Sequence, residues 1–275
     1  MFRTPMKFVT LHSLADVPDD AYPLIATPKY DGIRCVVQDG QAMSYQGKRI
    51  PNMYIRTQIE KYCKEGWDGE IVVDAKDGFG DVQSAVMSFD GEPRFRFMLL
   101  DVMPRPNGKD AGYNERRLPE IRILLPSFVL RAPVVVIRNY DALVKYENHI
   151  VIRGFEGIVL RNPNSLYKFG RATTRQHCWK YKRFSDAEAV VVGFEEMVSN
   201  EGKPKGTLGT IIGKRKDGGE VRVGGGKGMT AKMRQEIWNI RKAYMGKRFT
   251  YYFQKSGGKD GGKPRFGQFK CWRNI

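Results

Sequence analysis

The chain has 275 residues, 41% of them hydrophobic, so it can form one large domain or two of medium size. Its net charge of +17 indicates a polyanionic partner, nucleic acid above all, because basic side chains displace phosphate counterions; a merely basic protein is the alternative. The cysteines are far apart without a C-x-x-C pair and the histidines have no ligand spacing, which argues against a structural zinc site and suggests reduced thiols in an intracellular, cytoplasmic protein. No secretory signal is evident, and no apolar run reaches the roughly 18 residues of a membrane span.

The first part of the chain is built around one charged turn. Residues 1–28 form a leading segment that ends in a short strand at 24–28. Lys29-Tyr30-Asp31-Gly32-Ile33-Arg34 follows as a turn with a lysine at its tip, and residues 35–37 form the next strand. A lysine in such a turn is well placed to act as a nucleophile, although an ordinary charged hairpin has the same pattern.

Strands and helices alternate through the remainder of this part. Apolar and β-branched runs predict strands at 41–50 (with a turn), 67–73 (entered through the turn Asp68-Gly69-Glu70), 95–102, 134–137, 156–161 and 178–182. Helical spacing predicts helices at 55–65, 78–87, 113–125 and 141–153, the last capped by Asp141. Lys180 and Lys182 alternate on one strand and therefore share a face.

The composition changes near residues 184–187. Strands predicted at 189–195, 207–214, 220–223 and 248–254 are separated by glycine-rich turns and interrupted by a helix at 230–244. Short strands of this kind with one helix are typical of the five-stranded oligonucleotide-binding (OB) barrel, so we divide the chain into 1–184 and 185–275. From residue 186 onward, 19 Lys and Arg face only 9 Asp and Glu, as expected for a domain that contacts phosphates.

Several short features now stand in a recognisable order. They are Lys29–Arg34, Asp68-Gly69-Glu70, Leu100-Asp101, Glu156-Gly157 and Lys180-Tyr181-Lys182. In this order the chain resembles the covalent nucleotidyltransferase superfamily of ATP-dependent DNA ligases, RNA ligases and mRNA capping enzymes. The compact viral and phage ATP-dependent DNA ligases match best. The resemblance covers nearly the whole chain and implies an α+β fold, in which an adenylation domain of antiparallel sheets with flanking helices precedes an OB barrel.

The resemblance also implies roles for individual residues. The catalytic group would be Lys29, Asp31, Lys180 and Lys182, with Lys29 taking AMP in a covalent bond. This attack needs an unprotonated amine, and nearby lysines lower its pKa. The nucleotide site implied by the family comprises Lys29, Arg34, Glu70, Leu100, Glu156, Val159, Arg171, Lys180 and Lys182. Glu156 and Glu70 would hold Mg²⁺, which needs few carboxylates when phosphates and water complete its shell. DNA contacts would come from Arg34, Lys48, Arg49, Lys203, Lys205 and Lys227.

The chain departs from the family pattern at three places. Tyr45 follows Ser44 where the family has an arginine, so Lys48 or Arg49 would supply the missing phosphate contact. Leu100 stands where the family stacks an aromatic ring on adenine, and Val159 is a candidate for the opposite face. The last basic motif is only loosely matched by residues 265–273. Here Lys270 and Arg273 would either orient the pyrophosphate leaving group or contact DNA.

The resulting hypothesis is an ATP-dependent DNA ligase. It would act as a monomer on nicked double-stranded DNA, with ATP and Mg²⁺ as cofactors, in replication, repair and recombination. An RNA ligase or a capping-type guanylyltransferase shares the lysine chemistry, but residues 180–188 and the compact OB domain favour DNA. A non-catalytic OB-fold nucleic-acid binder is the alternative of a different class, against which the intact lysine and carboxylates argue.

Overall fold

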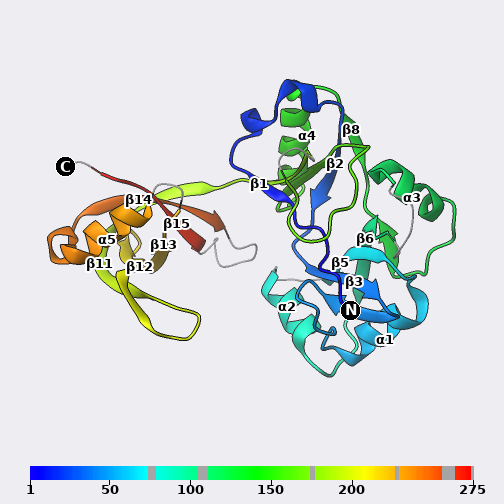
Figure 1. Ribbon diagram of the computed structural model, residues 1–275, viewed down its shortest axis with the longest axis horizontal. Helices are drawn as coiled ribbons and strands as arrows, with labels where there is room; N and C mark the ends of the chain where they lie inside the picture. The colour runs from blue at the N-terminus through cyan, green and yellow to red at the C-terminus, as the bar shows by residue number, and fades with distance from the viewer. Residues whose placement is uncertain (74–78, 105–110, 174–176, 227–228, 256–263, 274–275) are drawn as a thin grey trace. The chain divides into compact units, whose positions relative to one another are not determined.

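The computed structural model describes residues 1–73, 79–104, 111–173, 177–226, 229–255 and 264–273 (Figure 1). The chain forms two compact units, Met1–Lys182 and Arg183–Ile275, whereas the sequence placed the division after residue 184. Within these described ranges, every helix is too short or too polar to cross a membrane.

The first unit contains two five-stranded sheets. The first sheet has the order β1-β10-β9-β2-β8, formed by Val9–Leu11, Cys178–Lys182, Gly157–Arg161, Leu24–Lys29 and Val135–Ile137. The second has the order β4-β3-β5-β6-β7, formed by Gln41–Ser44, Ile33–Gln38, Trp67–Val73, Phe95–Val102 and Val129–Arg131. Neighbours are antiparallel except β1–β10 and β6–β7. The predicted α+β class is confirmed. The leading segment, for which only the strand at 24–28 was predicted, also contributes β1.

Helices flank both sheets of this unit. They are α1 (Met53–Tyr62), α2 (Phe79–Met87), α3 (Tyr113–Ile121) and α4 (Tyr140–Ile152). The prediction of Asp141 as the cap of α4 was wrong, because Asn139 Oδ1 accepts the Ala142 N–H at 2.9 Å and the helix starts one residue before the aspartate. Similarly, α1 starts earlier than expected because Asn52 caps it, and α3 ends at Ile121 rather than at 125.

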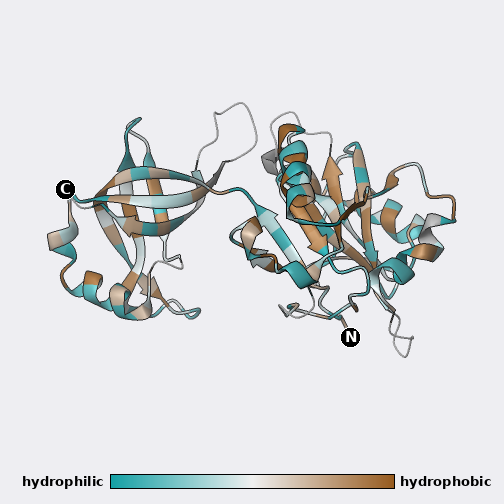
Figure 2. Ribbon diagram, turned by 90° about the horizontal axis from the view of Figure 1, so that it is seen from above, coloured by the Kyte–Doolittle hydropathy of each residue, from teal (hydrophilic) through white to brown (hydrophobic). Residues whose placement is uncertain are grey.

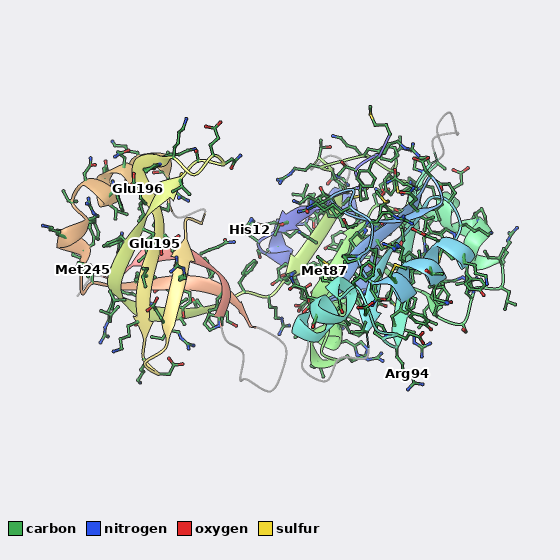
Figure 3. All side chains as sticks on the ribbon, turned by 90° about the horizontal axis from the view of Figure 1, so that it is seen from below. His12, Met87, Arg94, Glu195, Glu196 and Met245 are labelled. Atoms are coloured by element: carbon green, nitrogen blue, oxygen red, sulfur yellow. The ribbon has the colours of Figure 1, made fainter. Side chains whose placement is uncertain are left out.

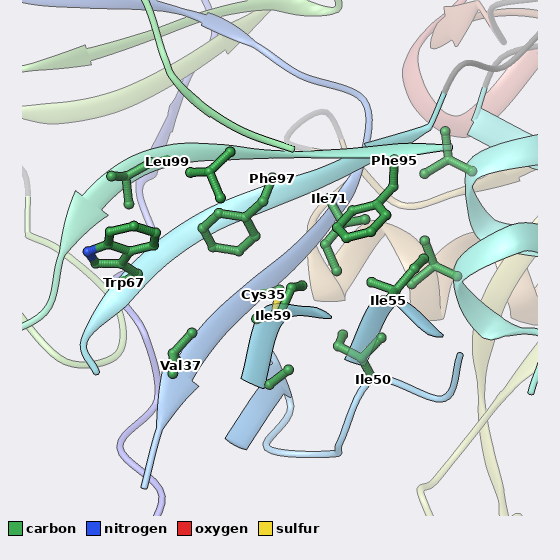
Figure 4. Packing of buried hydrophobic residues seen from close by; sticks show 14 residues of the cluster. Cys35, Val37, Ile50, Ile55, Ile59, Trp67, Ile71, Phe95, Phe97 and Leu99 are labelled. Atoms are coloured by element: carbon green, nitrogen blue, oxygen red, sulfur yellow. The ribbon is translucent and has the colours of Figure 1, made fainter. Parts of the chain in front are cut away.

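Strand alternation gives each sheet an apolar face and a face that carries polar side chains. In β5, Trp67 and Ile71 join the hydrophobic cluster that includes Ile55 and Ile59 of α1 (Figure 4). The intervening Asp68 and Glu70 face the opposite side. These acidic residues therefore belong to the strand itself and not, as predicted, to a turn before it.

The second unit is a closed barrel of order β11-β12-β13-β15-β14. Its strands are Ser185–Val198, Pro204–Arg215, Glu220–Gly224, Pro264–Trp272 and Arg248–Lys255. The last strand in sequence, β15, occupies the segment interpreted from the sequence only as a basic motif. The predicted helix at 230–244 is two helices, α5 (Ala231–Asn239) and a 3₁₀ helix at Arg241–Tyr244. Brown apolar segments run along the strands of both units in Figure 2.

Candidate active site

A cleft of about 220 Å³ opens between the polar faces of the two sheets in the first unit. The first sheet contributes β2, β9 and β10, and the second contributes β3, β5 and β6. The cleft brings together six residues that the sequence proposed for the nucleotide site: Lys29, Arg34, Glu70, Leu100, Val159 and Lys180. It is also lined by Met6, Lys7, Phe8, Thr27, Pro28, Tyr30, Tyr45 and Arg161.

Lys29 ends β2 and lies beside the first residue of β9. Its Nζ donates to Glu156 Oε2 at 2.5 Å and lies 3.5 Å from the Tyr30 carbonyl oxygen. Burial lowers the pKa of Lys29, and the positive charge of Arg34 acts in the same direction; the carboxylates of Glu70 and Asp31 oppose the shift. The amine is therefore easier to deprotonate than an exposed lysine, as an attacking nitrogen requires.

Two glycines allow the strands around Lys29 to approach one another. A Cβ on Gly32 would collide with the Ile71 carbonyl oxygen and lie 2.7 Å from Glu70 Cγ. A Cβ on Gly157, the register partner of Lys29, would collide with the Tyr181 carbonyl oxygen. Both glycines are thus required by close backbone approach.

The two predicted strand lysines are used differently. Lys180 lines the cleft opposite Val159 in the β9–β10 register, and burial together with Lys29 and Lys7 lowers its pKa. Lys182 instead forms an ion pair with Glu156, so that one carboxylate contacts both Lys29 and Lys182. Lys180 therefore borders the cleft, whereas Lys182, two residues later on the same strand, is paired with Glu156.

Lys7 is a cation of the cleft that the sequence analysis missed. It comes from the leading segment and lies with Nζ 5.5 Å from the ring centroid of Tyr45. This is the tyrosine that replaces the expected arginine, and both residues line the cleft. No local pattern marks Lys7, because its place depends on the pairing of its backbone with Gly170 and Ala172 far along the chain.

Arg34 is held by a buried acidic partner. Its Nε and Nη2 donate to Asp68 Oδ1 and Oδ2 at 2.5 and 2.7 Å. The hydroxyl of Tyr167 donates to the same carboxylate at 2.6 Å and accepts the Met6 N–H at 3.0 Å. A two-pronged pair of this kind fixes the plane of the guanidinium that borders the cleft.

A second buried carboxylate, Asp101, connects the two sheets. It accepts from Arg116 on α3 at 3.0 Å and from Arg161 on β9 at 2.6 Å. Strand alternation alone would turn Asp101 toward the hydrophobic cluster. A β-bulge around Leu100 shifts the register, so that Asp101 lies opposite Asp68. The same bulge borders the cleft through Leu100.

The remaining predicted residues of the first unit lie outside the cleft lining. Asp31 and Arg171 are exposed and act on Lys29 and Lys180, respectively, through charge alone. Lys48 is exposed, and Arg49 is committed to Glu60 by two contacts at 2.7 and 2.8 Å.

In the second unit, the proposed DNA-contacting lysines lie on an exposed hairpin. Lys203 lies in the connection between β11 and β12, and Lys205 is near the start of β12. In the same hairpin, Glu196 of β11, labelled in Figure 3, accepts the Gly206 N–H at 2.6 Å. Lys227 lies outside the described residues.

The two cations of the loosely matched last motif are both paired. Lys270 lies 2.6 Å from Asp186, and Arg273 lies 2.9 Å from Glu188. A role in orienting pyrophosphate would require both cations to leave these partners.

The two acids proposed as Mg²⁺ ligands both interact with Lys29, Glu156 by direct contact and Glu70 through its charge. Glu156 contacts its amine directly, and Glu70 lines the cleft with a pKa raised by burial. No group of three or more His, Cys, Asp or Glu side chains suited to a metal occurs in the part of the chain that the structure describes. The donor set fits an ion that takes most of its oxygens from nucleotide phosphates and water.

Comparisons with known proteins identify the family of the chain. A family model for the DNA ligase OB-like domain matches residues 201–273. The structure of the Chlorella virus DNA ligase–adenylate is 30% identical, covers 99% of both chains and has a TM-score of 0.58. The chain belongs to the ATP-dependent DNA ligase family. A DNA ligase of Haemophilus influenzae is 25% identical over 96% of this chain and 90% of its own. A Lig E DNA ligase structure, 22% identical over 98% of this chain and 99% of its own, shares the fold with a TM-score of 0.74.

Membership of this family makes the protein an enzyme that uses ATP and acts on DNA through a protein–AMP intermediate. The sequence resemblance to compact viral ligases is confirmed.

Proposed function

We propose that the protein seals nicks in duplex DNA and that Lys29 is the residue that carries AMP. The main support is the position of the Lys29 amine, which borders the cleft with a lowered pKa and contacts Glu156. In the proposed division of labour, residues 1–184 carry out adenylation and residues 185–275 contact DNA. The protein acts as a monomer, and its DNA substrate places its action inside the cell.

In the first step, the Lys29 amine loses its proton and attacks the α-phosphorus of ATP. A nitrogen–phosphorus bond forms, the bond from phosphorus to the bridging oxygen breaks, and pyrophosphate leaves. Lys180 lines the same cleft and supplies positive charge to the phosphate oxygens as their charge increases. Glu156 holds the amine before attack and also pairs with Lys182.

The nucleobase lies against aliphatic carbon in this proposal. Leu100 and Val159 both line the cleft and cover opposite faces of the base, with Leu100 at the position where the family pattern has an aromatic ring. Thr27 lies on β2 two residues before Lys29, and its buried hydroxyl has no hydrogen-bond partner among the described residues. Because such a group is costly when unpaired, a base that supplies the missing hydrogen bond gains affinity.

The later steps use the same amine as a leaving group. An oxygen of the 5′-phosphate at the nick attacks the AMP phosphorus, the bond to Lys29 breaks, and the amine recovers a proton. The 3′-hydroxyl then attacks the activated 5′-phosphate, and AMP departs as the strand closes. Glu156 and Glu70 are the residues that would hold Mg²⁺ together with phosphate oxygens, and the ion would supply neutralisation of phosphate charge.

A labelling experiment distinguishes DNA ligation from RNA ligation and from capping-type guanylyl transfer. The protein is incubated with Mg²⁺ and ATP or GTP labelled at the α-phosphate, then chased with nicked DNA or nicked RNA. We expect label from ATP that nicked DNA removes. Label from GTP alone, or label removed only by nicked RNA, would contradict the proposal.

Lys29→Ala tests the assigned residue. We expect label transfer to fall by more than about 10³-fold because the nucleophile is gone, while salt-sensitive DNA binding remains. Lys145→Ala, an exposed lysine on α4, is the matched control and keeps wild-type labelling. Equal loss of labelling and DNA binding in Lys29→Ala would show misfolding or a wrong assignment.

A further inference from the structure

The barrel of the second unit has a recess of its own, beside the β12–β13 turn. It measures about 700 Å³ and is distinct from the nucleotide cleft of the first unit. Strands β11, β12 and β14 and the first residue of β15 contribute to its walls. We call it the barrel recess; its polar and charged lining residues are Glu188, Lys214, Arg215, Lys216, Asp217, Arg248 and Tyr251.

Two buried donors on this lining have no hydrogen-bond partner among the described residues. Tyr251 is fully buried, at 0% exposure, and its hydroxyl makes no hydrogen bond within the described part of the chain. The Nε–H of Arg215 is also buried and unpaired there. Buried polar groups are nearly always hydrogen-bonded, so two orphans on one recess indicate a ligand that carries acceptors.

The arginine is held in position by its neighbours. Its Nη1 lies 3.1 Å from Asp217 Oδ2. An ideal Cβ on Gly219 would collide with Arg215 Nη2, so the guanidinium packs against the backbone of this glycine. The contacts that fix the side chain therefore leave Nε uncommitted.

The charges around the barrel recess favour an anion. Lys214, Lys216 and Arg248 are exposed, and none of them forms an ion pair with a described residue. The acids are already neutralised, since Asp217 pairs with Arg215 and Glu188 lies 2.9 Å from Arg273. A small oxyanion would enter a positive potential, and it would reach the two buried donors once the lining side chains move aside.

We propose that the barrel recess binds a phosphate group through the Tyr251 hydroxyl and the Arg215 Nε–H, with positive charge from Lys214, Lys216 and Arg248. The group is either a backbone phosphodiester of DNA, which rests on the function proposed above, or free phosphate. Burial raises the pKa of Tyr251, so its hydroxyl keeps the proton that it donates at neutral pH.

Site-resolved titration tests the proposal on the full chain. Inorganic phosphate is added to ¹⁵N-labelled protein at constant ionic strength, and amide shifts are followed by NMR. We expect saturable shifts at residues 214–217 and 251, separate from any shifts at residues 27–30 of the cleft. Shifts at 214–217 and 251 that increase linearly without saturating would overturn the proposal.

Tyr251→Phe removes only the unpaired hydroxyl. We expect phosphate affinity at the recess to fall at least about tenfold, equivalent to about 1.4 kcal/mol. The melting temperature should stay equal or rise, because the hydroxyl has no partner in the fold. Tyr244→Phe, whose ring packs on Trp272 away from the recess, is the matched control. Unchanged affinity in Tyr251→Phe would refute the site, and a lowered melting temperature would show that the hydroxyl serves the fold.

A charge-matched pair tests the rim. Lys216→Gln should weaken phosphate binding, whereas Lys242→Gln, an exposed lysine outside the recess, should not. If the two substitutions weaken phosphate binding equally, the binding reflects general surface charge, and the proposed site is overturned.

An unnicked DNA duplex distinguishes the two sources of phosphate. If the duplex shifts the recess amides and displaces phosphate, the ligand is the DNA backbone; if only phosphate does so, it is the free anion, and either result supports the site. If the unmodified protein does not seal nicks but its recess amides still shift saturably with phosphate, only the proposed function is contradicted. Normal sealing without saturable recess shifts would contradict this inference alone.

Discussion

Replacing Asp101 with asparagine tests the charge network beneath the nucleotide cleft. Asp101 is 1% exposed and accepts from Arg116 at 3.0 Å and from Arg161 at 2.6 Å. Asparagine keeps the shape but removes the charge, which leaves two buried guanidinium groups without their counterion. Breaking a buried ion pair costs about 3–5 kcal/mol, a large part of the roughly 5–15 kcal/mol by which domains are stable.

Hydrogen exchange read by mass spectrometry measures this loss within one unit. Whole-chain fluorescence would mix the two units, because each contains two of the four tryptophans, whereas peptides from β6 and β9 report on the first unit alone. The free energy of opening in these peptides should fall by about 3–5 kcal/mol in Asp101→Asn.

A surface pair provides the control. Glu60→Gln breaks the Arg49–Glu60 pair, whose side chains are 47% and 21% exposed, and should cost less than about 1 kcal/mol. If Asp101→Asn costs no more than this control, the reasoning about the buried network is refuted.

Three further outcomes follow from the cleft. The self-adenylation rate should rise with pH and level off below 10.5, the ordinary pKa of a lysine, because burial lowers the pKa of Lys29. Glu70→Gln removes a carboxylate that raises this pKa, so the rising limb of its residual rate should move to lower pH; a move to higher pH would contradict the assignment. Gly32→Ala should cost about 1–3 kcal/mol of stability and weaken AMP labelling, because the added methyl collides with Ile71 and crowds Glu70. Gly224→Ala, where the nearest atom is 4.0 Å away, should change neither thermal melting nor labelling, and equal behaviour of the two variants would disprove the crowding.

Local signals in the sequence predicted much of the secondary structure. The strands at 95–102 and 178–182 occur at the predicted residues, since β-branched and apolar runs bounded by breakers are local features. Helix ends were less predictable. Asn139 and Asp141 are both good caps, and the choice between them depends on the backbone that enters α4.

The cleft could be predicted only in part. Lys29, Arg34, Glu70 and Lys180 were found because they stand in ordered short motifs, and the structure places all four on one lining. Lys7 carries no motif, and its place in the cleft follows from pairing with a segment more than 150 residues away.

The sequence by itself indicated the class of chemistry, because the order of a lysine in a glycine-supported turn, several carboxylates and a lysine pair resembles that of the nucleotidyltransferase family. Only the tertiary structure decided the partners of these groups. It bonds Lys29 and Lys182 to one carboxylate, and a bulge brings Asp101 opposite Asp68. It also leaves the Tyr251 hydroxyl buried without a hydrogen-bond partner in the part of the chain that the structure describes. Register, burial and the absence of a partner arise from contacts between distant segments, and no local pattern in the chain encodes them.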